Sequence, residues 1–203
     1  MGQRILLICG SLQSGSANRR ALEVIGGHLE RLGIDVDEAD EIAAIPAFNP
    51  EIDESEATGV ASFLRRIAGS DSVVIAAPEY AGALAGAIKN ALDWVVGAGH
   101  LYGKPVVVLS SGTTGGVNAR HDLVRTLSWQ GAHVIGSLGI AAPRTKSAAD
   151  GRFTDPVTLD ELAELAVLAA AAATLPGAER LRLVGETTAA AGVGTERIAP
   201  MPS

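Results

Sequence analysis

Small hydroxyl and amide side chains gather near the start of the chain, in a pattern suited to holding an anion. An apolar run at 4–9 stops at Gly10 and is followed by Leu12-Gln13-Ser14-Gly15-Ser16-Ala17-Asn18, after which a helical pattern begins. The first amide groups of a helix have no intrahelical acceptor and lie at the positive end of the helix dipole. Ser11, Ser16 and Asn18 can add side-chain donors. This stretch is therefore a candidate phosphate-binding loop.

The loop differs from the two best-known phosphate motifs. No Gly-Lys-Ser/Thr follows its glycines, so it is not a Walker A loop, and it lacks the dinucleotide pattern G-x-G-x-x-G. A plain helix N-cap, in which Ser16 or Asn18 accepts a hydrogen bond from the first turn, is the alternative. Taken alone, the loop favours that alternative.

Two further loops of small and polar residues follow later apolar runs, and they reverse this preference. Pro78-Glu79-Tyr80-Ala81-Gly82 follows the run 72–77, and a stretch of serines, threonines and glycines at 110–116 follows the run 105–109. Ligands of open α/β sheets bind outside the carboxyl ends of the strands. We expect the first loop to bind phosphate and the other two to hold a flat ring system through backbone groups, which glycine lets approach closely.

Apolar periodicity alternates between strands and helices along most of the chain. The expected strands are at 4–9, 34–39, 72–77, 105–109 and 133–140, and the expected helices at 19–32, 56–68, 87–96, 119–130 and 159–175. This alternation predicts an α/β fold with a doubly wound, parallel, five-stranded sheet and helices on both faces. Strand order 2-1-3-4-5 would bring the three loops together. We expect one domain at 1–177 and a C-terminal tail at 178–203, flexible or partner-contacting, with some strand character at 181–184.

Composition narrows the function classes. The chain has 203 residues, 47% of them hydrophobic, and a formal charge of −7, which argues against a nucleic-acid partner. No apolar run is long enough to span a bilayer, and the N-terminus enters a strand without the basic region of a signal peptide. The single cysteine fits a reducing compartment, so we expect a cytoplasmic protein without a membrane partner.

The sequence offers no signature of metal or hydrolytic chemistry. Its four histidines lack the spacing of metal ligands, and no G-x-S-x-G nucleophile motif is present. Phe48, in a loop with two prolines, borders a ligand or has an ordinary packing role.

The motifs resemble those of a known family. They are Gly10-Ser11-Leu12 with Ser16-Ala17-Asn18, then Ala77-Pro78-Glu79-Tyr80 with Gly86-Ala87-Ile88-Lys89-Asn90-Ala91-Leu92-Asp93-Trp94, and, more weakly, the glycine-rich stretch 111–116. Over about residues 3–175 the chain resembles the NADPH-dependent FMN reductases, which have a flavodoxin-like fold and include bacterial quinone, chromate and azo reductases.

The resemblance implies FMN as cofactor and assigns residues to it. The FMN phosphate would be bound by residues of the first loop: Ser11, Ser16, Ala17 and Asn18. The isoalloxazine ring would lie along the second loop and be closed on its other side by the third: Pro78, Glu79, Tyr80 and Ala81, then Ser111, Gly112, Thr113, Thr114 and Gly115. Asp93 and Trp94 would support packing or subunit contact.

Three positions depart from the family pattern. Gln13 stands where the family often has an arginine, which leaves this phosphate-loop position without a charge partner for the phosphate; Arg19 or Arg20 could compensate, or be solvated. Ala81 replaces a usual asparagine near the ring, and Ala85 replaces a usual proline.

The expected activity is transfer of electrons from NADPH or NADH, the co-substrate, to a small-molecule acceptor by a ping-pong mechanism. The acceptor would be a quinone, an azo compound, a metal oxyanion or a flavin, and no side chain is assigned as catalytic because the cofactor does the chemistry. The alternatives are a free-flavin reductase that supplies reduced FMN to a monooxygenase, and a non-catalytic flavin-binding carrier or sensor. By resemblance we expect a homodimer or homotetramer. Small and apolar residues that would suit the interface, or equally a core, are Ala83, Leu84, Ala85, Ile88 and Leu92.

Overall fold

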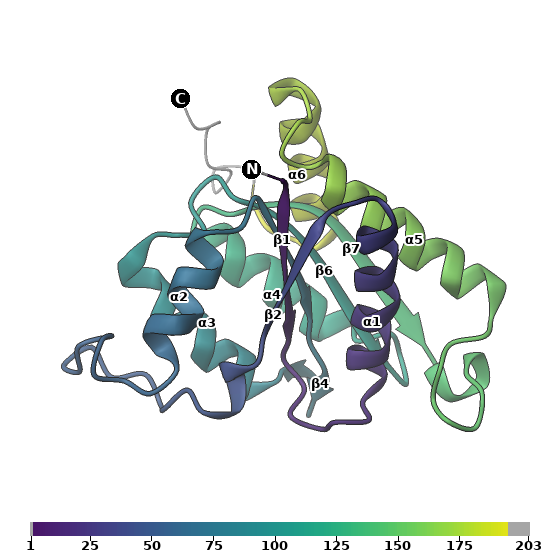
Figure 1. Cartoon of the computed structure of the whole chain (residues 1–203), viewed down its shortest axis with the longest axis horizontal. Coiled ribbons are helices and arrows are strands. Elements are labelled where there is room, and N and C mark those ends of the chain that lie inside the picture. Colours follow the sequence, from purple (N-terminus) through teal and green to yellow (C-terminus); the bar gives the residue numbers. More distant parts are fainter. Residues whose placement is uncertain (1, 195–203) are drawn as a thin grey trace.

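A five-stranded parallel sheet forms the centre of the molecule. The computed structural model describes residues 2–194 (Figure 1). The strands are β1 (Arg4–Cys9), β2 (Asp35–Ala39), β3 (Ser72–Ala76), β6 (Pro105–Gly112) and β7 (His133–Ala141). Their order is β2-β1-β3-β6-β7 and every neighbouring pair is parallel. This confirms the predicted flavodoxin-like fold and the order 2-1-3-4-5, since β6 and β7 are the fourth and fifth of these strands along the chain.

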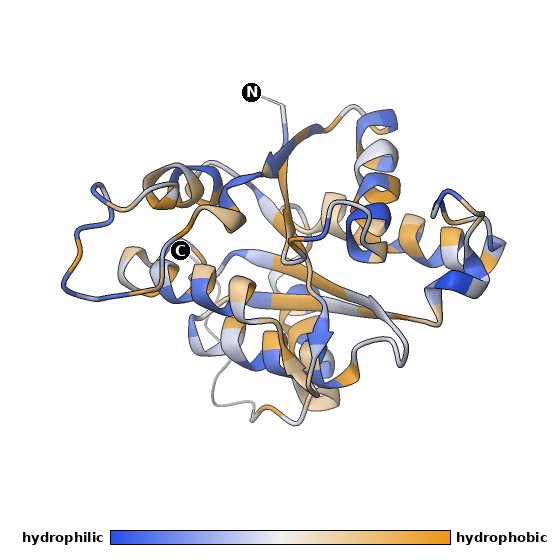
Figure 2. Ribbon diagram, turned by 90° about the horizontal axis from the view of Figure 1, so that it is seen from below, coloured by the Kyte–Doolittle hydropathy of each residue, from blue (hydrophilic) through white to orange (hydrophobic). Residues whose placement is uncertain are grey.

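Helices cover both faces of the sheet. One face carries α1 (Ala17–Arg31) and α5 (Pro156–Ala171), and the other carries α2 (Val60–Ala68), α3 (Gly86–Ala98) and α4 (Val117–Trp129). Successive side chains of β1 alternate between the two layers: Ile5 and Leu7 pack with α1, whereas Leu6 and Ile8 pack in the opposite cluster. Burial on both sides explains why the central strands are continuous apolar runs, which Figure 2 shows along the middle of the molecule.

A sixth helix corrects the prediction for the C-terminal region. Residues 181–184 were expected to have strand character, but they lie in α6 (Gly177–Ala190), which packs along β7. Alternation over four residues is too short to exclude a helix, and Val184 and Thr188, one turn apart, are both buried. The first half of the expected tail is thus part of the packed body. Residues 195–203 lie outside the described residues.

The second loop contains a small hairpin that sequence periodicity did not predict. Strands β4 (Glu79–Tyr80) and β5 (Ala83–Leu84) pair antiparallel across Ala81 and Gly82. Both connecting residues have positive φ, 52° and 73°, the pattern of a type I′ turn. Two-residue strands are too short to show a period, so only the glycine signalled this turn.

The other differences concern element ends and short helices. Strand β6 continues to Gly112, three residues past the expected end at 109, so Ser111 belongs to the strand. Short 3-10 helices occur at Glu41–Ala43 (η1) and Pro143–Lys146 (η2).

The stretch of α3 that resembles the family motif has a structural role. Asn90 Nδ2 and Trp94 Nε1 both donate to the carbonyl of Pro46, at 2.8 and 3.0 Å, and Asn90 Oδ1 accepts from the amide of Phe48. The Phe48 and Trp94 rings meet edge to face at 5.1 Å. These contacts confirm the packing role of Trp94. Of the two roles considered for Phe48, they support packing, because Phe48 connects the loop after η1 to α3.

Candidate functional site

A pocket of about 650 Å³ opens at the carboxyl ends of the strands. Its size is within the range of small-molecule and cofactor sites. Three predicted loops and one further segment line it: Ser11, Gln13, Gly15, Ser16, Ala17, Asn18, Pro78, Glu79, Tyr80, Ser111, Gly112, Thr113, Pro143, Arg144, Ser147, Ala148, Ala149 and Gly151. Of the predicted site residues, Ala81, Thr114 and Gly115 are outside this lining.

The first loop forms a helix cap and leaves donors available for an anion. Ser16 is the N-cap of α1, and its Oγ accepts from the amide of Arg19 at 3.2 Å, as the cap alternative predicts. The amides of Ala17 and Asn18 come first in the helix, where the backbone offers no intrahelical acceptor. The Ser16 hydroxyl keeps its hydrogen for a ligand, since accepting a bond does not use its donor. The two interpretations of this loop are therefore compatible.

Asn18 holds two loops together. Its buried side chain accepts from the amide of Ser111 at 2.9 Å and donates to the Ser111 carbonyl at 3.2 Å. This two-point bond joins the first turn of α1 to the end of β6. The Asn18 side chain is thereby committed to positioning, and its backbone amide is what faces a ligand at the helix end.

Ser111 provides the test of whether the pocket fits a polar ligand. Its side chain is 6% exposed and its Oγ has no hydrogen-bond partner within residues 2–194. A buried hydroxyl without a partner costs free energy. Because Ser111 lines the pocket, a ligand with polar edges would satisfy it. The site therefore fits FMN, whose ring carries carbonyl and nitrogen acceptors.

The second loop is fixed to α4 at two points. Glu79 Oε2 accepts from the amides of Asn118 and Ala119, at 2.8 and 3.1 Å. These amides begin α4, whose N-cap residue, Gly116, has no side chain to serve them. Asp122 Oδ2 accepts from the amide of Leu84 at 3.1 Å. The Glu79 carboxylate thus positions the hairpin, a role that sequence reasoning missed because the partner lies 39 residues away.

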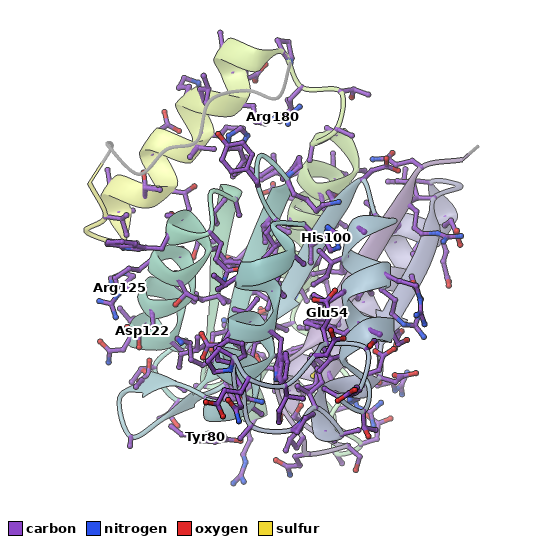
Figure 3. All side chains as sticks on the ribbon, turned by 90° about the vertical axis from the view of Figure 1, so that its left-hand side faces the viewer. Glu54, Tyr80, His100, Asp122, Arg125 and Arg180 are labelled. Carbon is purple, nitrogen blue, oxygen red and sulfur yellow. The ribbon has the colours of Figure 1, made fainter. Side chains whose placement is uncertain are left out.

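Tyr80 stands at the rim of the pocket. Its side chain is 60% exposed, and Figure 3 places it at the lower edge of the molecule, below Asp122 and Arg125 of α4. The neighbouring Pro78 is buried. Tyr80 is accordingly the exposed member of the second loop in the pocket lining.

The third loop is shaped by close backbone contacts. A Cβ on Gly116 would lie 1.9 Å from Ser110 Oγ, so only glycine fits there. Arg120 donates from Nε to the Gly115 carbonyl at 3.1 Å and from Nη1 to Ser137 Oγ at 3.0 Å. Burial lowers the pKa of the Arg120 guanidinium, and the charge of Glu79 opposes this shift. Thr114 bridges Ala141, so it and Gly115 form the base of the loop rather than the lining.

Sequence reasoning missed the fourth wall, the segment 143–151 that follows β7. It begins with η2 and closes with an antiparallel bridge between Ser147 and Phe153. The signal that could have found it is position: it leaves the carboxyl end of a sheet strand, as the other three loops do. It brings Arg144 to the pocket.

The two arginines considered as substitutes at the phosphate lie elsewhere. Arg20 Nη1 pairs with Glu23 at 2.8 Å on α1. Arg19 lines a separate small cavity together with Glu23 and Glu38. Neither is in the lining of the strand-end pocket.

A second cavity, of about 740 Å³, lies between α3 and α4. Its lining includes Val96, Tyr102 and Trp129, which are 60, 57 and 63% exposed. Of the residues expected to suit an interface, Ala85, Ile88 and Leu92 are instead buried in the chain's own core. We refer to this second cavity as the α3–α4 groove.

Two further searches cover the described part of the chain. Among residues 2–194, no three side chains of histidine, cysteine, aspartate or glutamate are grouped to hold a metal ion. No helix in that part combines the length and apolar character needed to cross a membrane.

Comparison with known proteins gives concordant matches. The chain is 34% identical to an NAD(P)H-dependent FMN reductase of Pseudomonas aeruginosa over 163 residues, which is 75% of this chain and 85% of that protein. It is 28% identical to the quinone reductase of Escherichia coli K12 over 168 residues, 78% of this chain and 89% of that protein. Among solved structures, the flavoenzyme NAD(P)H:(acceptor) oxidoreductase of Paracoccus denitrificans superposes with a TM-score of 0.66 at 26% identity, covering 81% and 93% of the two chains. The family model of the NADPH-dependent FMN reductases matches residues 3–146, and the chain belongs to that family.

Proposed function

We propose that the protein is an FMN-dependent oxidoreductase that takes electrons from NADPH or NADH and passes them to a small-molecule acceptor. The observation that carries this proposal is the strand-end pocket, which combines a helix N-terminus, a buried hydroxyl that has no partner within residues 2–194, and an exposed tyrosine in its lining. A phosphate at one end and a planar ring at the other match these features. Membership of the family supports the same assignment.

Residues of three loops would hold the cofactor. Ser16 and the amides of Ala17 and Asn18 would bind the phosphate, with Ser11 beside them. Pro78 and Tyr80 would lie along the ring, and Ser111 to Thr113 would close its other side. FMN, when bound, supplies the capacity to accept a hydride and to return electrons to an acceptor.

The protein's part in the reaction is positioning and electrostatics. Backbone amides of the second and third loops that lie near the ring would stabilise negative charge on it. The open side at Tyr80 would admit a nicotinamide and then the acceptor to the same place, which predicts ping-pong kinetics. The only carboxylate in the lining, that of Glu79, is bonded to α4, and we assign no side chain a proton-transfer role.

The acceptor is proposed by class. The relative named quinone reductase supports a quinone. Azo compounds, metal oxyanions and free flavin are further candidates for the same site. The runner-up is a free-flavin reductase, favoured by the solvent-exposed Gln13 in the phosphate loop. A carrier or sensor is the least favoured, because Tyr80 alone offers an aromatic ring in the lining.

The test is the visible spectrum of the purified protein with added FMN, followed by anaerobic NADPH. Tight binding with bleaching of the flavin band is expected. Weak binding with turnover of added flavin would support the free-flavin alternative, and binding without bleaching would support a carrier. A protein that binds no FMN would contradict the proposal.

We further propose that the protein is cytoplasmic and a homodimer or homotetramer. The α3–α4 groove is our candidate for the contact between copies, because its large exposed apolar side chains would be covered by a second chain. Light scattering after size-exclusion chromatography measures the mass directly, and a monomer at all concentrations would contradict the oligomer.

A further inference from the structure

Arg144 is the one cationic side chain among the residues that line the strand-end pocket. The lining contains a single other charged residue, Glu79, whose carboxylate is occupied by two amides of α4. Within residues 2–194, no carboxylate forms an ion pair with Arg144 and its side chain makes no hydrogen bond. Its five N–H donors are therefore available to a ligand.

The segment that carries Arg144 lines the same pocket as the first loop. Its residue Gly151 is close to α1, since a Cβ there would be 3.9 Å from Arg20 Nε. The neighbouring Asp150 is paired with Arg152 at 2.6 Å, so its charge is already balanced within the segment. Arg144 therefore shares one pocket with Gly15, Ser16 and Ala17 of the first loop.

The phosphate end of the pocket needs such a cation. A phosphate monoester carries close to two negative charges at neutral pH, whereas a helix N-terminus offers about half a positive charge and Ser16 is neutral. Arginine binds phosphate oxygens through two parallel hydrogen bonds and keeps its charge at any working pH. The buried Ser111 hydroxyl marks the same pocket independently as one built for a polar ligand.

We propose that Arg144 is a specificity-determining residue that pairs with a phosphate monoester in the strand-end pocket. The inference rests on the proposed function, because two ligands of that function carry such a group. One is the 5′-phosphate of FMN, and the other is the ribose phosphate that distinguishes NADPH from NADH. In both cases Arg144 discriminates a phosphorylated ligand from its phosphate-free counterpart.

The experiment compares wild type with Arg144→Ala on two ligand pairs. FMN and riboflavin affinities are measured by fluorescence titration, and kcat/KM is measured with NADPH and with NADH. Arg144→Ala is expected to weaken the phosphorylated member of one pair by about ten- to a hundredfold, the range for a lost charged hydrogen bond, and to leave its counterpart unchanged. Arg144→Lys, which keeps the charge without the two-point geometry, is expected to give an intermediate loss.

The pattern of losses identifies the ligand. A fall in the FMN-to-riboflavin preference assigns Arg144 to the cofactor, and a fall in the NADPH-to-NADH preference at unchanged FMN affinity assigns it to the co-substrate. Arg182→Ala is the matched control: it removes one exposed arginine charge from α6, at the opposite end of the sheet, and both preferences should stay at wild-type values (Figure 1).

Two results would overturn the inference alone. The first is that Arg144→Ala keeps the wild-type preference for phosphorylated ligands. The second is an equal loss of affinity for phosphorylated and phosphate-free ligands, which would mean that Arg144 only supports the shape of the segment. A wild-type protein that binds neither FMN nor riboflavin would instead overturn the proposed function, and the inference with it.

Discussion

The strand-end pocket and the α3–α4 groove have similar volumes, about 650 and 740 Å³, and opposite characters. The pocket is lined by backbone groups, hydroxyls and small residues from four loops. The groove is lined by α3, α4 and the segments that follow them, and it exposes Val96, Tyr102 and Trp129. The groove has the larger volume of the two cavities. The chemistry of the walls nevertheless makes the pocket the better site for a ligand.

The two cavities also differ in how their walls are held. Hydrogen bonds between segments far apart in sequence fix the pocket: the buried pair between Asn18 and Ser111, and the more exposed bonds from Glu79 to α4. The groove carries exposed ion pairs within single helices, Lys89 with Asp93 and Arg125 with Asp122. Exposed pairs of this kind contribute little to stability, typically below about 1 kcal/mol. A preorganised polar wall suits a cofactor, whereas a wall of exposed apolar side chains suits another protein surface.

Ser16→Asp should give the largest effect and should act on the pocket alone. Aspartate is as good an N-cap as serine, so α1 is expected to remain stable. Its negative charge would however face the phosphate in place of a neutral donor, and FMN affinity should fall by about a hundredfold or more, with riboflavin affinity unchanged. Titration of both flavins against the variant measures the difference.

Ser14→Asp is the control for charge near the loop, because Ser14 is exposed and outside the pocket lining. Its FMN affinity should stay close to that of wild type. If Ser16→Asp bound FMN as wild type does, the assignment of the phosphate to this loop would be wrong.

Trp129→Glu should act on the groove alone. Replacing a large exposed aromatic side chain of the contact with a charged one is expected to raise the dissociation constant between copies by at least about tenfold. The mass from light scattering should then fall at low protein concentration, while the FMN affinity stays unchanged. Val167→Glu, which places the same charge at an exposed apolar site on α5, is the matched control and should keep the wild-type mass.

An unchanged mass in Trp129→Glu would contradict the groove as the contact between copies. A loss of FMN affinity in that variant would contradict the prediction that a change in the groove leaves the strand-end pocket unaffected.

Sequence reasoning predicted the parts of the fold that depend on local pattern. The apolar runs of β1 and β3 identified strands buried on both faces, and alternation with helices predicted the parallel sheet and its order. The three loops at the strand ends followed from the general position of ligands in such sheets. Most of the predicted site residues accordingly line the pocket.

The parts that sequence reasoning missed depend on contacts between distant segments. Nothing near Asn18 in the sequence indicates that its side-chain amide is hydrogen-bonded to the backbone of Ser111, 93 residues away. Nothing near Glu79 indicates that it caps α4. Arg144 reaches the pocket only because β7 lies next to β6, so its relevance depends on the tertiary fold.

Ala81→Asn and Ala81→Gly should give the smallest effects. They distinguish two roles for position 81, one in the hairpin turn and one at the ligand. Ala81 sits in the hairpin turn with φ of 52°, a conformation that costs a residue with a Cβ about 1 kcal/mol. Asparagine tolerates this conformation, so Ala81→Asn should stabilise the fold by about 0.5 kcal/mol and raise Tm by about 1–2 °C. Glycine relieves the same strain but loses part of the gain to the entropy of the unfolded chain.

The pair of variants tests whether position 81 belongs to the turn or to the ligand. The family resemblance places this position along the ring, where the usual asparagine would add a side-chain amide. The structure instead places Ala81 outside the pocket lining, at the corner between β4 and β5. If the turn alone matters, both variants raise Tm and neither changes FMN affinity. If the asparagine amide reaches the ring, only Ala81→Asn tightens FMN binding, and the wall of the pocket would extend past Tyr80 to the tip of the hairpin.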